Sequence, residues 1–174
     1  MMTIDLQASD NPATDTQVDA AAAWIVVSPD KPRWRDLPHG KTLGVRYARQ
    51  PAVSVNEAWA TDLPNRRSTR AVHLPLAAAL TPFELLGAAR RAVELALEHN
   101  PRELLVSVEG CGREITAAAC EALASAALAR TVALPVAKRM PPPASKLARL
   151  RFMGRGAAID SRRCLLYTSP SPRD

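Results

Sequence analysis

The sequence predicts an α/β domain in which helices flank a mixed, largely parallel sheet. Short apolar runs rich in β-branched residues alternate with long amphipathic helical segments. The runs are continuous rather than alternating, which is typical of strands covered on both faces. Strand, helix, strand, helix, strand in this order favours parallel pairing. Because 47% of the residues are hydrophobic and 23% are charged, the chain can build a globular core.

The N-terminal segment 1–23 is predicted to be a disordered leader. Residues 1–19 are polar and acidic, and they offer little apolar area to offset the entropy of ordering them. They also lack the charged-then-apolar order of a secretory signal. No run approaches the roughly 18 to 20 apolar residues of a membrane span. We therefore expect a cytoplasmic protein without membrane contact.

The first buried element is the run 22–28 (AAWIVVS), predicted to be a two-sided strand that ends at Pro29. Residues 32–37 are predicted to form a turn or short helix, since a proline and a glycine follow closely. Residues 43–47 alternate between apolar and polar or small side chains. That alternation indicates a weak strand, with a short helix as a nearly equal alternative.

Residues 50–58 are predicted to form a loop, and 69–74 (TRAVHL) a second strand. A helix then begins at a capping box, in which Thr81 is the N-cap, a proline follows it, and Glu84 lies three residues on. The helix should end near Asn100, because Pro101 disfavours a helical residue before it. Its predicted buried stripe contains Phe83, Leu85, Leu86, Ala88, Ala89, Arg90, Ala92, Val93, Ala96 and Leu97.

The second half repeats the pattern of strand and helix. Residues 104–108 (LLVSV) predict a buried strand that closes at two glycines. A second helix is expected over 113–129, with Ile115, Ala119, Ala122, Leu123 and Ala126 on one face. Residues 131–137 indicate a short strand, 141–143 (PPP) an extended connector, and 147–153 a final strand.

The last eleven residues, 164–174 (CLLYTSPSPRD), match at every position the translation of a transposase-end adapter used in sequencing libraries. We expect this tail to be non-native and exclude it from fold reasoning. Its removal leaves the net charge at +6, because the tail carries one Arg and one Asp. The natural reading frame is then expected to be interrupted after Arg163.

Few residues carry a chemical signal. The histidines His39, His73 and His99 have no metal-ligand spacing, and His99 at a helix end is most simply a cation on the helix dipole. Cys111 and Cys120 form no CxxC motif, which favours reduced, buried cysteines, although Cys111 before a predicted helix is a position where a thiol can be acidified. Walker, GxGxxG, GxSxG and HExxH motifs are absent.

Two polar segments have open interpretations. Asp62 and Asn65 are either ligand contacts or, more simply, turn residues, and Arg66 and Arg67 are equally consistent with solvated charges. No acidic residue lies between Glu121 and Asp160. The basic residues of that stretch either bind a phosphate backbone or are solvated surface charges. The solvated surface is favoured because Phe152 is the only aromatic residue among them. They are Arg130, Lys138, Arg139, Lys146, Arg149, Arg151 and Arg155.

Several segments together resemble one known family. They are WRDLPHG at 34–40, TDLPN at 61–65, the helix FELLGAARRAVELALEHNP, the strand LLVSVEG and finally KRMPPPASKLARLRFMG. In this order they resemble the N-terminal domain of proteobacterial members of the leucyl aminopeptidase (cytosol aminopeptidase) family. The resemblance covers roughly residues 24–163.

The resemblance implies a macro-domain-like fold over 24–155 and the start of an interdomain linker over 156–163. It also implies a missing C-terminal catalytic domain that holds two divalent metal ions, zinc or manganese, and removes N-terminal residues from peptides. The family's signature NTDAEGR does not occur, so no catalytic, cofactor-binding or metal residue is assigned to this chain. A homo-oligomer, a hexamer in the family, is expected.

Two other functions stay open. A stand-alone macro-like module would bind ADP-ribose or a related nucleotide, but such modules use glycine-rich loops, and the seven glycines here form no dense run. A basic nucleic-acid-binding domain is the less favoured alternative, because no recognition-helix pattern accompanies the basic stretch.

Overall fold

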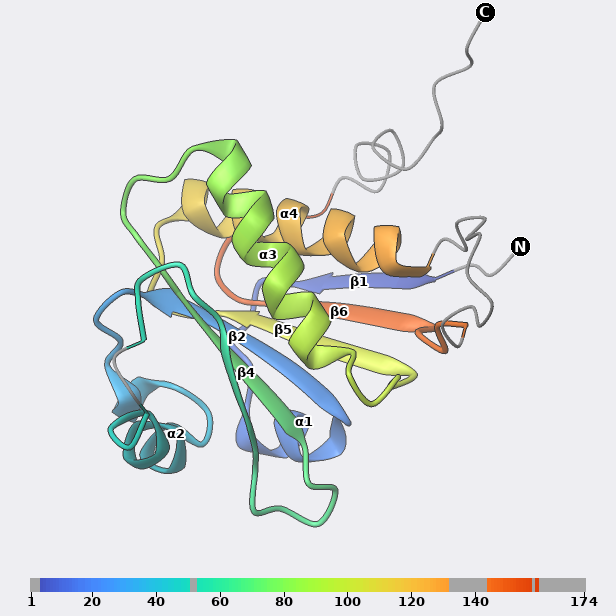
Figure 1. Cartoon of the computed structure of the whole chain (residues 1–174), viewed down its shortest axis with the longest axis horizontal. Helices are drawn as coiled ribbons and strands as arrows, with labels where there is room; N and C mark the ends of the chain where they lie inside the picture. Colours follow the sequence, from blue (N-terminus) through green and yellow to red (C-terminus); the bar gives the residue numbers. More distant parts are fainter. Residues whose placement is uncertain (1–3, 51–52, 132–143, 158, 160–174) are drawn as a thin grey trace, which may run out of the picture.

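The computed structural model describes residues 4–50, 53–131, 144–157 and 159, and these form one sheet with helices on both faces (Figure 1). In chain order the elements are β1 (Asp5–Ser9), α1 (Asp15–Ala20), β2 (Ala23–Pro29), the 3-10 helix η1 (Trp34–Asp36), α2 (Gly40–Tyr47), β3 (Trp59–Asp62), β4 (Arg70–Leu76), α3 (Pro82–Ala96), β5 (Glu103–Val108), α4 (Arg113–Thr131) and β6 (Arg149–Met153).

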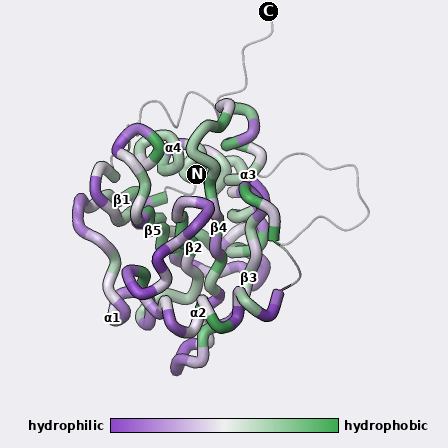
Figure 2. The backbone as a smooth tube through the Cα atoms, turned by 90° about the vertical axis from the view of Figure 1, so that its left-hand side faces the viewer, coloured by the Kyte–Doolittle hydropathy of each residue, from purple (hydrophilic) through white to green (hydrophobic). Residues whose placement is uncertain are grey.

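The strand order is β1-β6-β5-β2-β4-β3. Every neighbouring pair is parallel except β3–β4, which is antiparallel. The prediction of a mixed, largely parallel sheet flanked by helices is therefore confirmed. In Figure 2 the central strands are hydrophobic, and hydrophilic residues are concentrated in the segments around them.

Strand β2 lies at the centre of the sheet, and Ala23 to Ser28 are buried throughout. It pairs with β4 on one side and β5 on the other. Ile25 and Val27 belong to the core under α3 and α4. Trp24 and Val26 belong to a second core on the opposite face. The continuous apolar run is thus a strand that two layers cover, as predicted.

Helices α3 and α4 pack on the first face through small side chains. The capping box is confirmed, since Thr81 Oγ1 accepts from Glu84 N at 3.3 Å and Glu84 Oε2 accepts from Thr81 N at 2.9 Å. Phe83, predicted to be buried, is 85% exposed. Phe83 and Ala92 are nine residues apart, so at about 100° per residue they point to opposite sides of the helix. The buried stripe of α3 consists of Ala88, Ala89, Ala92, Val93 and Ala96.

The prediction of a disordered leader over residues 1–23 is wrong for its described part. Strand β1 pairs with β6, and a Thr14–Gln17 capping box begins α1. Val18 is fully buried in the core beneath α1. The segment is ordered because β6 supplies backbone partners for β1, and because the second face of β2 requires a cover that α1 provides.

The remaining predicted elements differ from the structure in part, and some lie outside the described residues. Residues 40–47 form helix α2, so the helical alternative is correct and the strand is wrong. The short strand β3 was not predicted. The segments 131–137 and 141–143 lie almost entirely outside the described residues, as do most of 156–163 and the whole of 164–174. No helix in the described ranges is long and apolar enough to cross a membrane.

If α1 covers the second core, Val18→Ala should lower the free energy of unfolding by about 2 kcal/mol, since two buried methyl groups are lost and a cavity remains. Urea unfolding measures this value. Val55→Ala, at a side chain that is 38% exposed, is the matched control and should change stability by less than about 0.5 kcal/mol. Equal effects of the two substitutions would contradict the buried position of Val18.

Candidate functional site

His73 on β4 is the centre of a buried polar and aromatic cluster on the second face. Its Nε2 lies 2.8 Å from Ser28 Oγ, and its Nδ1 accepts from Trp59 Nε1 at 3.0 Å. The rings of Trp34 and Tyr47 lie 5.1 and 5.9 Å from the imidazole centroid. We call these five residues the His73 cluster. Their side chains come from β2, η1, α2, β3 and β4, so the cluster forms only in the folded domain.

The hydrogen bonds determine the tautomer of His73. An indole N–H can only donate, so Nδ1 of His73 carries no proton and the neutral ring carries its proton on Nε2. Nε2 therefore donates to Ser28 Oγ, and Ser28 Oγ donates onward to the carbonyl oxygen of Pro29 at 3.0 Å. Burial lowers the pKa of His73 from 6.5 to about 4, which keeps the ring neutral at neutral pH.

This arrangement does not activate Ser28 as a nucleophile. A catalytic histidine must accept the hydroxyl proton, whereas His73 donates to that hydroxyl, and its other nitrogen faces an indole rather than a carboxylate. Ser28 and His73 are also 0% and 1% exposed. The His73 cluster therefore holds β2, β3 and β4 together and performs no acyl-transfer chemistry.

The segments at 34–40 and 61–65 meet at helix α1. Asn65 Nδ2 donates to Asp19 Oδ1 at 2.7 Å and to Thr69 Oγ1 at 2.9 Å. His39 Nε2 lies 3.0 Å from the same Asp19 oxygen, and the His39 backbone N–H donates to Asp15. Although this pair is within ion-pair distance, Nε2 makes no well-aligned hydrogen bond. These residues position α1, which supports the turn interpretation of Asn65.

The remaining polar candidates are surface groups. Asp62 pairs with Arg70 at 3.4 Å, and Arg66, Arg67 and His99 are exposed. Of the three histidines, His39 lies beside Asp19 and His73 lies beside Ser28. Among the described residues, no three His, Cys, Asp or Glu side chains are grouped so that they could hold a metal ion.

The two described cysteines are poor nucleophiles. Burial, with the Glu109 charge as a smaller contribution, raises the pKa of the Cys111 thiol to about 11. Burial likewise raises the pKa of Cys120 to about 12. A thiol with a raised pKa carries almost no thiolate at neutral pH. The position before α4 therefore does not acidify Cys111, and the structural interpretation of both cysteines is favoured.

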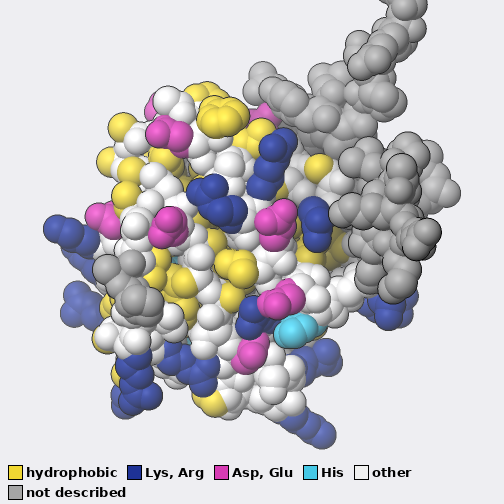
Figure 3. Space-filling model, in the orientation of Figure 1, with side chains coloured by type: hydrophobic (Ala, Val, Ile, Leu, Met, Phe, Trp, Pro, Cys, Tyr) yellow, Lys and Arg dark blue, Asp and Glu magenta, His cyan; other side chains and the backbone are white. Residues whose placement is uncertain are grey.

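The basic stretch is partly neutralised where the structure describes it. Arg149 lies 3.5 Å from Asp5 and 3.4 Å from Glu103, and Arg151 lies 3.2 Å from Glu103. On the face shown in Figure 3, basic and acidic side chains are interspersed between hydrophobic ones. Such paired charges do not form the continuous stripe that a phosphate backbone requires. Lys138 and Arg139 lie outside the described residues.

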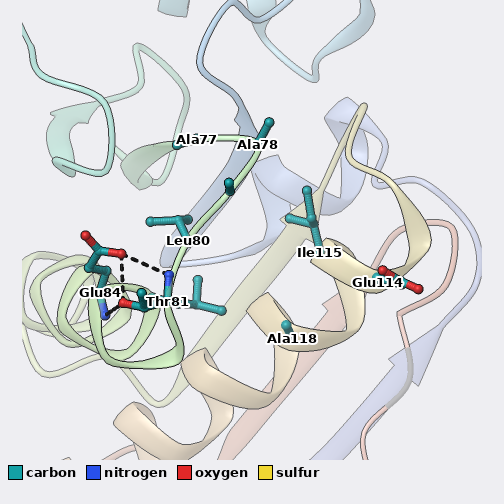
Figure 4. Close-up of a pocket in the computed structure, with 10 residues that line it drawn as sticks. Ala77, Ala78, Leu80, Thr81, Glu84, Glu114, Ile115 and Ala118 are labelled. Carbon is teal, nitrogen blue, oxygen red and sulfur yellow. Dashed lines mark hydrogen bonds between the residues drawn. The ribbon is translucent and has the colours of Figure 1, made fainter.

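Two cavities lie at the carboxyl ends of the parallel strands. The larger, about 510 Å³, is bounded by the β4–α3 loop and the first turns of α3 and α4. Figure 4 shows Leu80, Ile115 and Ala118 around it. Glu84 is held by the Thr81 cap, and Glu114 is the other carboxylate of the lining. The cavity is predominantly apolar.

The smaller cavity, about 320 Å³, lies between the ends of β2 and β5. These strands are hydrogen-bonded neighbours, but the chain leaves β2 toward β4 and leaves β5 toward β6, so they form the topological switch point of the sheet. We call this cavity the switch-point crevice. Its charged lining residues are Lys31, Arg33, Asp36 and Glu109.

Sequence reasoning missed both the His73 cluster and the switch-point crevice. Trp34, Tyr47 and Trp59 are far apart in the chain, and their convergence depends on the β2–β4 pairing. One signal was present, since the chain has only seven aromatic residues and three of them, Trp34, Tyr47 and Trp59, lie between the predicted strands 22–28 and 69–74. The charges of the crevice were visible only as separate loop residues.

Because His73 is neutral in the fold and protonates below about pH 6.5 when unfolded, acid should destabilise the protein. Between pH 6.5 and about 4 the unfolded chain binds one more proton, so the free energy of unfolding falls as the pH falls, by about 3 kcal/mol over the window. His73→Gln should remove this part of the slope. The measurement is urea unfolding at several pH values.

His99→Gln, an exposed histidine, is the control and should keep the wild-type slope. An identical pH dependence for wild type and His73→Gln would contradict the neutral, buried imidazole.

Comparison with known proteins bears on the fold. No protein-family model and no curated protein matches the sequence. Among solved structures, the chain is similar to a tomato leucine aminopeptidase, with a TM-score of 0.65 and 14% identity, over 96% of this chain and 36% of that one. It is also similar to the macro domain of ganglioside-induced differentiation-associated protein 2, with a TM-score of 0.52 and 12% identity, over 87% and 77% of the two chains.

At sequence identities of 14% and 12%, the similarity to these structures shows the fold alone. The chain spans 36% of the length of the aminopeptidase that it matches. The macro domain, by contrast, is matched over most of its own length. The chain thus has a macro-domain-like α/β fold, and this fold also occurs as one part of a leucine aminopeptidase.

Proposed function

We propose that this chain is the non-catalytic N-terminal domain of a larger, metal-dependent exopeptidase of the leucyl aminopeptidase type. The single observation that carries the proposal is the asymmetry of coverage, in which 96% of this chain corresponds to 36% of an aminopeptidase. A domain that corresponds to one part of an enzyme is expected to act together with the rest of it. The parent protein would remove N-terminal residues from peptides.

The contacts of the resembling segments support this proposal. WRDLPHG contributes Trp34 to the His73 cluster and His39 to the contact with α1. TDLPN contributes Asn65 to the same helix. These segments therefore stabilise the fold. Such a role is expected of segments that are characteristic of a non-catalytic domain.

Catalysis would belong to the missing C-terminal domain. The two expected metal ions, zinc or manganese, would activate water and polarise the scissile carbonyl there. The described residues offer no cluster of metal donors, so we derive no catalytic step for this chain. A cytoplasmic homo-oligomer, a hexamer by resemblance, completes the proposal.

The natural reading frame beyond the Arg163 codon provides the test. We expect it to continue into a segment that contains the family's metal-binding signature. The extended protein should release leucine from a leucyl substrate when zinc or manganese is present, whereas the 174-residue chain should not. An in-frame stop codon within a few residues, or peptidase activity of the 174-residue chain alone, would contradict the proposal.

A stand-alone macro-like module is the second candidate, favoured by the match to a macro domain over 77% of its length and by the cavities at the carboxyl edge. Calorimetric titration of the 174-residue chain with ADP-ribose distinguishes the two functions. The aminopeptidase proposal expects no saturable heat, because few glycines line these cavities and backbone amides cannot closely surround a pyrophosphate. Saturable binding would favour the module instead.

A further inference from the structure

The switch-point crevice combines several properties of a ligand site. In open α/β sheets, ligands bind outside the carboxyl ends of the strands at the point where the chain changes direction. Its volume of about 320 Å³ lies at the lower end of the roughly 300 to 1,000 Å³ typical of ligand pockets. A metabolite of amino-acid size fits this space better than a dinucleotide.

The crevice is lined by charges of both signs, with Lys31, Arg33 and Asp36 on the wall that follows β2 and Glu109 on the wall that follows β5. Lys31 and Arg33 follow β2, whereas Glu109 follows β5 directly and its backbone N–H donates to Val27 at 2.9 Å. In the part of the chain that the structure describes, no ion pair joins Lys31 or Arg33 to Glu109. Both signs of charge are therefore available to a ligand between the walls.

Glu109 is the anchor of the acidic wall. The carboxylate is half-buried, and Ala13 N donates to its Oε1 at 3.3 Å, which holds the side chain in place. Burial raises the pKa of Glu109 because it removes part of the solvation of the carboxylate. A positive partner would compensate for that loss. Gly110 follows with φ of +73°, a conformation that turns the chain at the rim of the crevice.

The charge pattern selects among ligand classes. A simple anion would meet Glu109 and Asp36, and a simple cation would meet Lys31 and Arg33. A small zwitterion satisfies both walls, because its ammonium can pair with Glu109 while its carboxylate pairs with Arg33 or Lys31. We propose that the switch-point crevice binds a free α-amino acid, with its ammonium on Glu109 and its carboxylate on the Lys31–Arg33 wall.

Isothermal titration calorimetry of the 174-residue chain with L-leucine tests this site. We expect saturable binding. Leucinamide, which lacks the carboxylate, and isocaproate, which lacks the ammonium, should each bind at least about tenfold more weakly, since each loses one charge-assisted pair. The absence of saturable heat with leucine would overturn the proposal, as would equal affinity for isocaproate.

Variants assign the two walls. Glu109→Gln keeps an oxygen for Ala13 N and should weaken leucine binding about tenfold or more, as should the double substitution Lys31→Gln/Arg33→Gln, which removes both cations from exposed positions. Glu94→Gln and Arg66→Gln, exposed residues away from the crevice, are matched controls and should bind as wild type does. Thermal unfolding checks that each variant folds.

Wild-type affinity in either folded crevice variant would contradict the assignment. None of these outcomes bears on the aminopeptidase proposal, because a free amino acid reports on the crevice and not on peptidase activity.

Discussion

The burial of β2 on both faces is the constraint on which the rest of the structure depends. Trp24, Ile25, Val26 and Val27 are all 0% exposed, and each such side chain contributes about 1.5 to 3 kcal/mol only if it is fully covered. Two layers must therefore be built around one strand. Helices α3 and α4 form the first layer, and α1, η1 and α2 form the second.

The second layer must also satisfy buried polar groups. Trp24 Nε1 donates to Ser107 at 2.9 Å, and Trp59 Nε1 donates to His73. An unsatisfied buried donor would cost about 1 to 3 kcal/mol. The first bond joins β2 to β5 and the second joins β3 to β4, on the face where α1 and α2 dock. The described part of the N-terminal segment is therefore ordered because α1 covers the second face of β2.

The first layer could be predicted from local sequence, and the second could not. The Thr81–Glu84 box, the apolar runs and their order along the chain are local signals, so the strands β2, β4 and β5 and both long helices were predicted correctly. Residues 4–23 and 40–47 are weakly apolar, and their structure depends on contacts that they make with distant residues. Phe83 shows the same limit, since spacing alone did not distinguish the alanine stripe from the opposite side of α3.

The candidate site was even less accessible to sequence reasoning. The residues of the switch-point crevice come from two loops more than seventy residues apart, and only the β2–β5 pairing brings them together. The β2–β4 pairing positions the His73 cluster, whose Ser28 also lines the crevice. In the structure His73 joins strands in the core, whereas the loop charges line a crevice; the sequence shows only isolated polar residues.

Hydrogen exchange of the native protein, followed by mass spectrometry, tests the two-sided burial of β2 most directly. The account predicts that the amides of Val18 in α1 and of its C-cap residue Ala21 are protected, as are those of β2. Both sets should lose protection together as urea is added, because α1 is one cover of β2. Exchange of the α1 amides at the rate of an unstructured peptide, while β2 stays protected, would contradict it.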